Sequence, residues 1–355
     1  MTLRVALLHP VYWPEVRRGS ERFARELADG LLARGHRPRL IVGHRGWRPR
    51  TTVEDGLPVT RVPRLPEGRL DRRQYEPHLT HVPFAAAALR AGGPFDVVHA
   101  LHPVSALAAP RDTPLVLSIM GVPHHANLAT RRWRLEIWRR ALERADAIVA
   151  LSETAARATE RWLGVRPRVI APGVDLAAFT PGGQRAPTPV ILCAADATAP
   201  YKRVGLLAEA FARVQRERPD ARLVLSRPRR GAVPFDGDGI DWRDLDDRDA
   251  LVAACREAHV AALPSVGEAF GLVLAEALAC GTPVVGSVPE VLGDDDRVGR
   301  LFTGDSADAL ALALLEAIDL AADPQTTARC RAHAEAFGID RTVDAYVALY
   351  REIGS

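Results

Sequence analysis

The sequence predicts an α/β protein made of two doubly wound domains, each a mostly parallel sheet covered by helices. Its length of 355 residues is typical of two domains. Near the N-terminus, a strand over residues 3–8, a loop, a helix over 20–34 and a strand over 40–42 form the unit that begins such a sheet. A second strand–turn–helix–strand unit spans residues 260–285. These two units predict two sheets of the same class.

The composition excludes several classes of protein. Hydrophobic residues make up 47% and charged residues 26% of the chain, as in an ordinary soluble protein. No stretch approaches the roughly 20 apolar residues of a membrane span, and residues 1–10 read as a strand rather than as a secretion signal. The four cysteines have no metal-binding spacing and imply no pairing, which favours a reducing cytoplasm.

The charge is divided unevenly along the chain. Residues 1–175 contain 28 arginines against 17 acidic residues, a net charge of +11, whereas residues 176–355 have a net charge of −8. A basic half favours an acidic acceptor or an anionic membrane surface as a partner. No nucleic-acid recognition motif is present in the sequence, so we expect no nucleic-acid partner. The alternative is that the arginines only cover solvated faces.

The first half of the chain alternates strands and helices. Ser20 is suited to cap a helix in which Phe23, Leu27 and Leu31 recur at helical spacing. Ser152 similarly ends one strand and caps the next helix. The further strands predicted in this half cover residues 59–62, 95–100, 115–118 and 145–152, and a basic helix covers 131–144.

The second half repeats this alternation after a change of composition. Residues 176–188 contain proline and glycine and have no apolar period, which predicts a linker between a domain of residues 1–175 and a domain of residues 189–338. We expect residues 339–355 to form a helix that crosses back to the first domain. The strands predicted in the second domain include 190–193, 221–226 and 260–263, and its helices include 249–258, 271–280, 307–321 and 326–337.

The stretch from Leu263 to Glu290 carries most of the chemistry in the sequence. Gly267 permits a tight turn before the helix over 271–280, and Gly281 stands where a helix-ending glycine belongs. The N-terminus of a helix behind a glycine turn presents unpaired N–H groups and a positive dipole end. It therefore suits an anionic or oxygen-rich ligand.

Two carboxylates lie in this stretch, Glu268 before the helix and Glu276 in its second turn. A carboxylate buried on an otherwise apolar helix needs partners. A diol such as a ribose would satisfy both oxygens of Glu276. The alternative is that both glutamates face water.

Glu268 and Glu276 belong to a longer pattern, PS-x-x-E-x-F-G-x-x-x-x-E-A-x-A-x-G-x-P-V-V. This pattern resembles the signature of retaining GT-B glycosyltransferases, most closely family 4 with its E-x7-E motif. The resemblance implies a GT-B fold, in which two Rossmann-like domains face a cleft that holds the active site. It implies that Glu276 holds the ribose hydroxyls of a nucleotide. It also implies that Glu268 binds the donor sugar together with the backbone of Phe270 and Gly271.

Lys202 is the only lysine in the chain, against 46 arginines. Where arginine is the usual cation, a single ammonium indicates a need for a compact point charge. Its position before a helix resembles the phosphate clamp of the family, which implies that it neutralises the donor diphosphate as the bond breaks. The family often has an arginine shortly before this lysine, but Asp196 and Ala197 occupy that region, so Arg203 is the candidate replacement. The alternative is a solvated cation at a helix start.

The N-terminal loop resembles the glycine-rich first loop of the family, which lies near the donor phosphate and the acceptor. Gly19 and Glu21 match the pattern, whereas Arg18 replaces its first glycine. A histidine that commonly faces the sugar in the family is Met120 here. His102, His124 and His125 are the candidates to face the cleft instead, the alternative being structural or surface histidines.

Five of the six arginines in the basic helix over 131–144 are interleaved with Trp133, Ile137 and Trp138. Such a helix is suited to lie on an anionic membrane, and the alternative is a core-packing helix with a solvated basic face. The localisation we expect is the cytoplasm, with peripheral contact at the inner membrane face left open.

The resemblance predicts an enzyme that moves a sugar from a nucleoside-diphosphate sugar to an acceptor hydroxyl with retention of configuration. The donor is a UDP-sugar or GDP-mannose, and the sequence chooses neither the base, the sugar nor the acceptor. We expect no metal and no cofactor. One alternative is a non-catalytic protein or partner subunit that binds a nucleotide sugar, motivated by Met120 and the missing arginine. The other is a GT-B enzyme of different chemistry, such as an epimerase or a phosphorylase.

Overall fold

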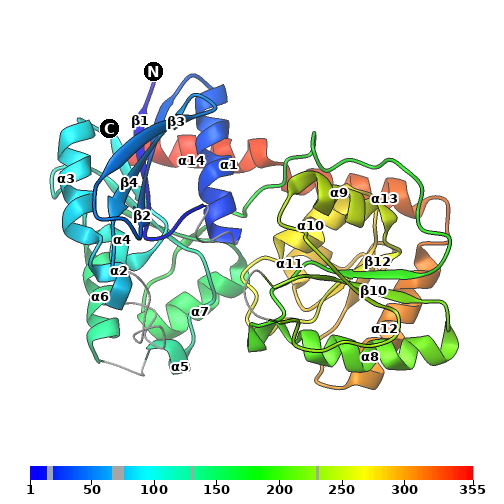
Figure 1. Ribbon diagram of the computed structural model, residues 1–355. Coiled ribbons are helices and arrows are strands. Elements are labelled where there is room, and N and C mark those ends of the chain that lie inside the picture. The colour runs from blue at the N-terminus through cyan, green and yellow to red at the C-terminus, as the bar shows by residue number, and fades with distance from the viewer. Residues whose placement is uncertain (14–18, 66–75, 129–131, 229–231, 355) are drawn as a thin grey trace. The chain divides into compact units, whose positions relative to one another are not determined.

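The computed structural model describes residues 1–13, 19–65, 76–128, 132–228 and 232–354 (Figure 1). The chain divides into two compact units, one of Met1–Pro172 with Ile339–Ser355 and one of Gly173–Gly338. The first unit is therefore made from both ends of the chain, and the second from one continuous stretch.

The first unit is built on a sheet of eight strands within the described residues. Every neighbouring pair is parallel except β3 with β4. The strand order is β3-β4-β2-β1-β5-β6-β7-β8, which reverses between β1 and β5. The carboxyl ends of these two strands flank the switch point at which open α/β sheets bind ligands. The strands are β1 (Arg4–His9), β2 (Arg37–His44), β3 (Arg50–Glu54), β4 (Leu57–Pro63), β5 (Val97–Ala100), β6 (Leu115–Ile119), β7 (Ala147–Ala150) and β8 (Arg168–Val169).

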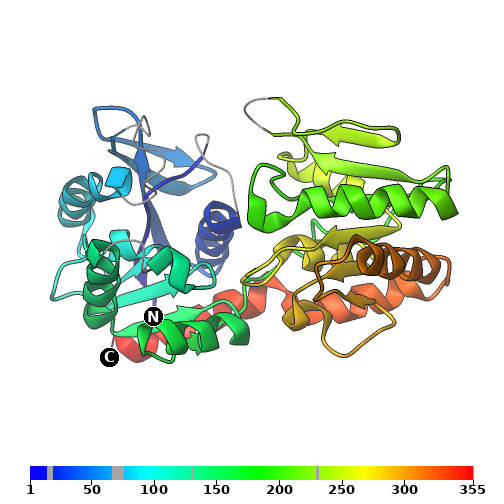
Figure 2. The same cartoon turned by 90° about the horizontal axis from the view of Figure 1, so that it is seen from below.

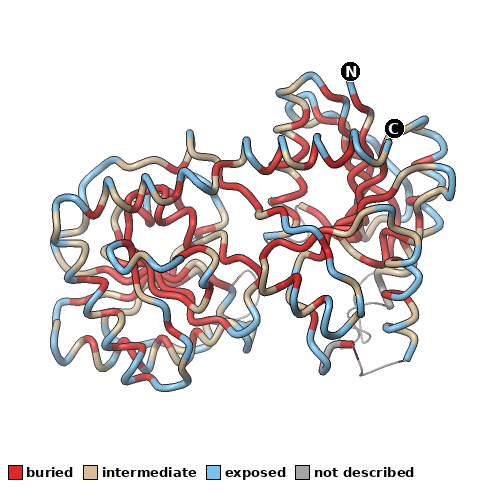
Figure 3. The backbone as a smooth tube through the Cα atoms, turned by 180° about the vertical axis from the view of Figure 1, so that it is seen from behind, coloured by how far each residue is buried: buried red, intermediate tan, exposed pale blue. Residues whose placement is uncertain are grey.

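Helices cover both faces of this sheet. Because successive residues of a strand face opposite sides, Val5 and Leu7 of β1 share a core with α1 and α14, whereas Ala6 and Leu8 share a core with α3 and α4. Figure 2 shows α1 and α3 on opposite sides of the sheet, and Figure 3 shows the buried stretches of this unit, in red, gathered toward its middle. The helices are α1 (Gly19–Ala33), α2 (Glu76–Leu79), α3 (Val82–Gly92), α4 (Pro103–Ala106), α5 (His125–Leu128), α6 (Arg132–Arg144), α7 (Glu153–Leu163) and α14 (Ile339–Ile353).

Helix α14 docks on the first sheet through a buried polar network. The Nδ1 atom of His99 lies 2.7 Å from the hydroxyl of Tyr350, and its Nε2 lies 2.7 Å from Oγ of Ser118. That Oγ is also 2.9 Å from the hydroxyl of Tyr346. Burial lowers the pKa of His99 to about 3 and raises the pKa of both tyrosines. The network is therefore held by uncharged hydrogen bonds near neutral pH.

In the part of the second unit that the structure describes, six parallel strands form a sheet in the order β11-β10-β9-β12-β13-β14. Helices α8 and α12 lie on one face, and α9, α10 and α13 on the other (Figure 1). The strands are β9 (Val190–Cys193), β10 (Arg222–Ser226), β11 (Ile240–Arg243), β12 (Val260–Leu263), β13 (Val284–Gly286) and β14 (Gly299–Leu301). The α-helices are α8 (Val204–Glu217), α9 (Arg248–Glu257), α10 (Leu272–Ala279), α11 (Pro289–Leu292), α12 (Ala307–Leu320) and α13 (Thr326–Ala334). Two short 3₁₀ helices are η1 (Pro200–Lys202) and η2 (Glu335–Phe337).

Two of the three predicted helix caps are confirmed. The third is wrong, because Ser20 lies inside α1, which already includes Gly19, and its hydroxyl donates to Glu21. Ser152 Oγ accepts a hydrogen bond from the backbone N–H of Ala155 at 3.1 Å and begins α7. At the end of α10, Gly281 has a φ of 85°, and the N–H of Thr282 donates to the carbonyl of Ala277 at 2.9 Å. This pairing closes the last turn, so a residue without a Cβ is needed there.

The stretch predicted as a linker, residues 176–188, lies within the second unit. Phe179 is 1% exposed, and the guanidinium of Arg331 donates to its carbonyl at 2.7 Å. Arg256 donates to the carbonyl of Thr180 at 2.8 Å. Arginines distant in sequence thus hold this stretch on the unit. Across the ranges that the structure describes, no helix has both the length and the apolar character to cross a membrane.

Candidate active site

Two segments 66 residues apart in sequence meet beyond the carboxyl ends of β9 and β12, which are neighbours in the second sheet. Lys202 Nζ forms an ion pair with Glu268 Oε2, and the two side chains are only 19% and 16% exposed. The backbone N–H of Val266 also donates to the carbonyl of Tyr201 at 2.8 Å. The lone lysine and the first motif carboxylate therefore share one site.

The turn before α8 is held by the side chain of Arg203. This residue follows the 3₁₀ turn with a φ of 52°, a value that residues other than glycine rarely adopt. Its Nε donates to the carbonyl of Pro264 at 2.5 Å, and its Nη1 to Gly304 at 3.1 Å and to Asp305 at 2.6 Å. These described contacts fasten the turn to the loop after β12 and to the loop after β14.

Helix α10 begins directly after the Glu268 turn. Gly271 is its N-cap, with a φ of 82°, and a Cβ there would lie 3.1 Å from Cγ2 of Val288. Both conformation and space therefore favour glycine. Gly271 has no side chain with which to cap this first turn, so its N–H groups and the positive end of the helix dipole suit an anion.

Glu276 lies in the second turn of α10 and is 1% exposed. It is the one charged residue on a helix whose other members are apolar. Phe270 is also buried, and its ring packs edge-on against Phe337 with centroids 5.5 Å apart. The ring of Phe270 therefore belongs to the core, which leaves its backbone as the part suited to meet a ligand.

The first unit holds the other candidate residues. Glu21, in the first turn of α1, is 1% exposed, and its Oε1 lies 4.0 Å from Nδ1 of His9 at the end of β1. Its Oε2 accepts a hydrogen bond from Ser20 at 3.1 Å. A Cβ at Gly19 would meet nothing within 4 Å, so the described packing does not itself require glycine. Arg18 lies outside the described residues.

His102 follows β5 and caps α4, where its Nδ1 accepts a hydrogen bond from the N–H of Val104 at 3.2 Å. Its ring meets that of His78 edge-on, with centroids 5.2 Å apart. Burial, together with the charges of His78, His9 and His81, lowers the pKa of His102 well below its ordinary value. His102 is therefore neutral near pH 7 and suited to hydrogen bonding rather than to ion pairing.

His9, His78, His81 and His102 form a group that we call the histidine cluster. His81 is fully buried, contacts the carbonyl of His78 through Nδ1, and lies 3.3 Å from Oγ of Ser105 through Nε2. Burial lowers the pKa of His81 to about 4. The sequence singled out only His102 of the four. The sequence did contain one signal for the cluster, because His9 and His102 each follow or end a strand at its carboxyl end, beside the switch point.

The structure also places three other features that the sequence analysis named: His124, Met120 and the basic helix α6. His124 is exposed, with its Nδ1 3.4 Å from the carbonyl of Val122. Met120 packs against the apolar core of the first unit. In α6, Trp138 is buried, whereas Arg139 and Arg140 both pair with Glu136 on the same helix.

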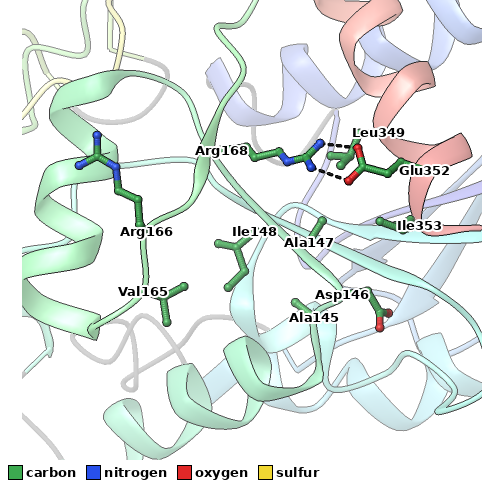
Figure 4. A pocket seen from close by; sticks show the side chains of 10 residues that line it. All are labelled: Ala145, Asp146, Ala147, Ile148, Val165, Arg166, Arg168, Leu349, Glu352 and Ile353. Atoms are coloured by element: carbon green, nitrogen blue, oxygen red, sulfur yellow. Dashed lines mark hydrogen bonds and ion pairs between the residues drawn. The ribbon is translucent and has the colours of Figure 1, made fainter.

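Two surface hollows of the first unit are lined by other residues. One of about 230 Å³ is lined by β7, β8 and α14, and Figure 4 shows the ion pair of Arg168 with Glu352 beside it. Another of about 340 Å³ is lined by Leu89, Phe95 and their neighbours. Neither includes a candidate residue. Among the residues with a described position, no group of histidine, cysteine or acidic side chains is arranged to hold a metal ion.

Sequence relatives place this geometry in a family. Residues 17–178 match the model described as Glycosyltransferase Family 4, and residues 188–319 match Glycosyl transferases group 1. The D-inositol 3-phosphate glycosyltransferase of Mycolicibacterium gilvum is 30% identical over 349 aligned positions, covering 85% of this chain and 77% of that protein. The enzyme of the same name from Geodermatophilus obscurus is 36% identical, over 58% of this chain and 52% of that protein.

Solved structures agree on the architecture. The sucrose-phosphate synthase of Thermosynechococcus elongatus has a TM-score of 0.82 at 21% identity, covering 99% of this chain and 98% of that one. Anabaena HepE, solved with UDP and glucose, has a TM-score of 0.70 at 17% identity, covering 99% and 100%. The fold is GT-B, with two Rossmann-like domains. The family models and the relatives define the class of protein as a glycosyltransferase. The chain belongs to glycosyltransferase family 4, which confirms the predicted family, fold and enzyme class.

Proposed function

We propose that this enzyme transfers a sugar from a nucleoside-diphosphate sugar, either a UDP-sugar or GDP-mannose, to an acceptor hydroxyl. The proposed reaction retains the anomeric configuration and uses neither a metal nor a cofactor. One observation carries the proposal: the Lys202–Glu268 pair lies beside the start of α10, where the N-cap residue is a glycine. A cation, a carboxylate and a helix dipole thus gather at the sheet edge where ligands of α/β proteins bind.

The donor-side roles follow from these charges. The ammonium of Lys202 would stabilise the diphosphate as the sugar–oxygen bond breaks. Glu268 would exchange its pairing with Lys202 for the hydroxyls of the sugar, beside the backbone of Phe270 and Gly271. Arg203 would position Lys202 and Glu268, because its described contacts tie the turn before α8 to the loop after β12 and to Asp305. The acceptor hydroxyl would attack on the face that the diphosphate leaves, and its proton would pass to a departing phosphate oxygen.

The buried carboxylate of Glu276 would hold the ribose hydroxyls of the donor. This role is tested by calorimetric titration with UDP and GDP. Glu276→Gln keeps the volume and removes the charge, and it should weaken binding at least tenfold because a charge-assisted hydrogen bond contributes about 1.5–3 kcal/mol. The control is Glu209→Ala, at an exposed position of α8. Equal affinity in the Glu276→Gln variant and the wild type would refute the ribose role.

We assign acceptor binding to the switch point of the first sheet, where Gly19, Glu21 and the histidine cluster lie. The relatives named D-inositol 3-phosphate glycosyltransferase suggest a phosphorylated polyol. The net charge of +11 over residues 1–175 supports an anionic acceptor. Initial rates measured with inositol 3-phosphate and with inositol test whether the acceptor must be anionic. If the phosphate is required, only inositol 3-phosphate should be turned over. Equal rates would remove the anionic acceptor from the proposal.

The same basic charge supports a peripheral contact with an anionic membrane from the cytoplasmic side, through the arginine face of α6. Sedimentation with vesicles of neutral and anionic lipid measures this contact. Binding to anionic vesicles that is lost on raising the salt concentration is the expected result. Absence of binding at low salt would refute it.

A further inference from the structure

Two apolar side chains stand exposed beside the Lys202–Glu268 pair. Tyr201 is 55% exposed and Val266 is 57% exposed, whereas the side chains of Lys202 and Glu268 are mostly buried. The backbone N–H of Val266 donates to the carbonyl of Tyr201 at 2.8 Å, so the two residues are neighbours in space. Single exposed apolar residues are ordinary on a protein surface, but two neighbours at the edge of a polar site favour a ligand with an apolar part.

The ring of Tyr201 lies against the ammonium of Lys202. Nζ is 5.3 Å from the centroid of the ring, within the range of about 6 Å over which an aromatic face attracts a cation. The same Nζ is paired with Oε2 of Glu268. The aromatic ring and the carboxylate therefore contact one nitrogen, which brings both within reach of a single hexose.

The backbone that carries Tyr201 is fixed by hydrogen bonds within the second unit. Tyr201 is the middle residue of η1, where the N–H of Lys202 donates to the carbonyl of Ala199 at 2.9 Å. The N–H of Arg203 donates to the carbonyl of Pro200 at 3.1 Å. A ligand that packs on the ring therefore has to order only the side chain of Tyr201, which lowers the entropic cost of binding.

We propose that Tyr201 is a further donor-binding residue, whose ring packs against the C–H face of the donor hexose while Glu268 binds hydroxyls of the same sugar. A hexose in its ring form presents hydroxyls around its rim and C–H groups on its faces. It is therefore suited to a site that offers a carboxylate and a flat apolar surface together. This inference rests on the proposed function, because it requires Glu268 to bind the donor sugar.

The contact is tested by calorimetric titration of the wild type and Tyr201→Ala with UDP, GDP, UDP-glucose, UDP-N-acetylglucosamine and GDP-mannose. A sugar nucleotide that the wild type binds should bind Tyr201→Ala about tenfold more weakly, the effect expected from about 50 Å² of buried aromatic surface. The matching free nucleoside diphosphate should keep its affinity, because it has no sugar to contact the ring. Equal losses for both ligands would show that Tyr201 acts through Lys202 and would overturn the sugar contact. No loss for either ligand would overturn it as well.

Two further variants test whether the aromatic ring is responsible. Tyr201→Phe keeps the ring and should bind the sugar nucleotide as tightly as the wild type. A loss as large as that of Tyr201→Ala would assign the contact to the hydroxyl and overturn the inference. The matched control is Leu312→Ala, which removes an apolar side chain that is 59% exposed on α12 and should change none of the affinities.

The same titrations distinguish a failure of this inference from a failure of the proposed function. If the wild type binds none of the five ligands, the proposed function is refuted and this inference with it. If the wild type binds a nucleoside diphosphate but none of the three sugar nucleotides, only the sugar contact is overturned, because the nucleotide site is then present without a sugar for Tyr201 to contact.

Discussion

Acid should destabilise the first unit through His99. Its imidazole is fully buried, and its two nitrogens contact Tyr350 and Ser118. Burial lowers its pKa to about 3 in the folded protein, whereas an unfolded histidine has a pKa of about 6.5. As the pH falls, the unfolded chain therefore binds this proton first. Stability is lost progressively below pH 6.5 until the folded state is also protonated near pH 3.

The size of the effect follows from proton linkage. Between pH 7 and pH 5, the two pKa values predict that His99 removes about 2 kcal/mol from the free energy of unfolding. His81, with a pKa of about 4, adds a loss of similar size. The contribution of His99 is therefore isolated by His99→Gln, whose amide can donate and accept hydrogen bonds but does not titrate.

Urea unfolding measured by tryptophan fluorescence reports on this unit. Five of the six tryptophans belong to it, and Trp242→Phe removes the sixth. In the Trp242→Phe background, the free energy of unfolding lost between pH 7 and pH 5 should be about 2 kcal/mol smaller for His99→Gln than for the parent. His124→Gln, at an exposed position, should keep the full loss. The same acid-induced loss with and without His99 would refute the reasoning.

The remaining predictions concern the second unit. Lys202→Met should lower kcat about 100-fold or more, because its charge acts as the diphosphate leaves; steady-state kinetics with wild-type kcat would contradict this. Arg203→Lys should weaken UDP binding less than Lys202→Met in parallel titrations, since its contacts are with Pro264, Gly304 and Asp305; equal losses would indicate direct phosphate contact. Gly271→Ala should cost about 1–2 kcal/mol of stability, because its φ is 82° and the new Cβ would crowd Val288. Denaturation followed through Trp242, with the other tryptophans replaced, measures that cost, and an unchanged midpoint would argue against it.

The sequence predicted the features that depend on local pattern. Strands and helices alternate because their apolar periods differ, and this alternation was enough for two doubly wound sheets. Ser152 and Gly281 were correctly read as helix ends, since a cap is decided by residues within one turn. The spacing of Glu268 and Glu276 likewise depends on a single turn and helix.

Features that depend on sheet order were not predicted. The anchoring of Arg203 joins it to loops after two other strands, and the histidine cluster gathers side chains from separate elements around one switch point. The segment 176–188 has the composition of a flexible linker, but hydrogen bonds from Arg256 and Arg331 fix part of it on the second unit. Neither contact can be predicted from composition or from apolar spacing, because each joins segments that meet only in the folded sheet. The roles of the candidate site residues stay predictions.

Building the first unit from both ends of the chain has a consequence for its biosynthesis. Residues 1–172 leave the ribosome without Tyr346 and Tyr350, which fill the core and hydrogen-bond to Ser118 and His99. The second unit is continuous and is complete by Gly338, before the last helix has been made. We therefore expect the usual order, in which the N-terminal domain folds first during translation, to be reversed here, because the first unit cannot complete its core before α14 has been synthesised.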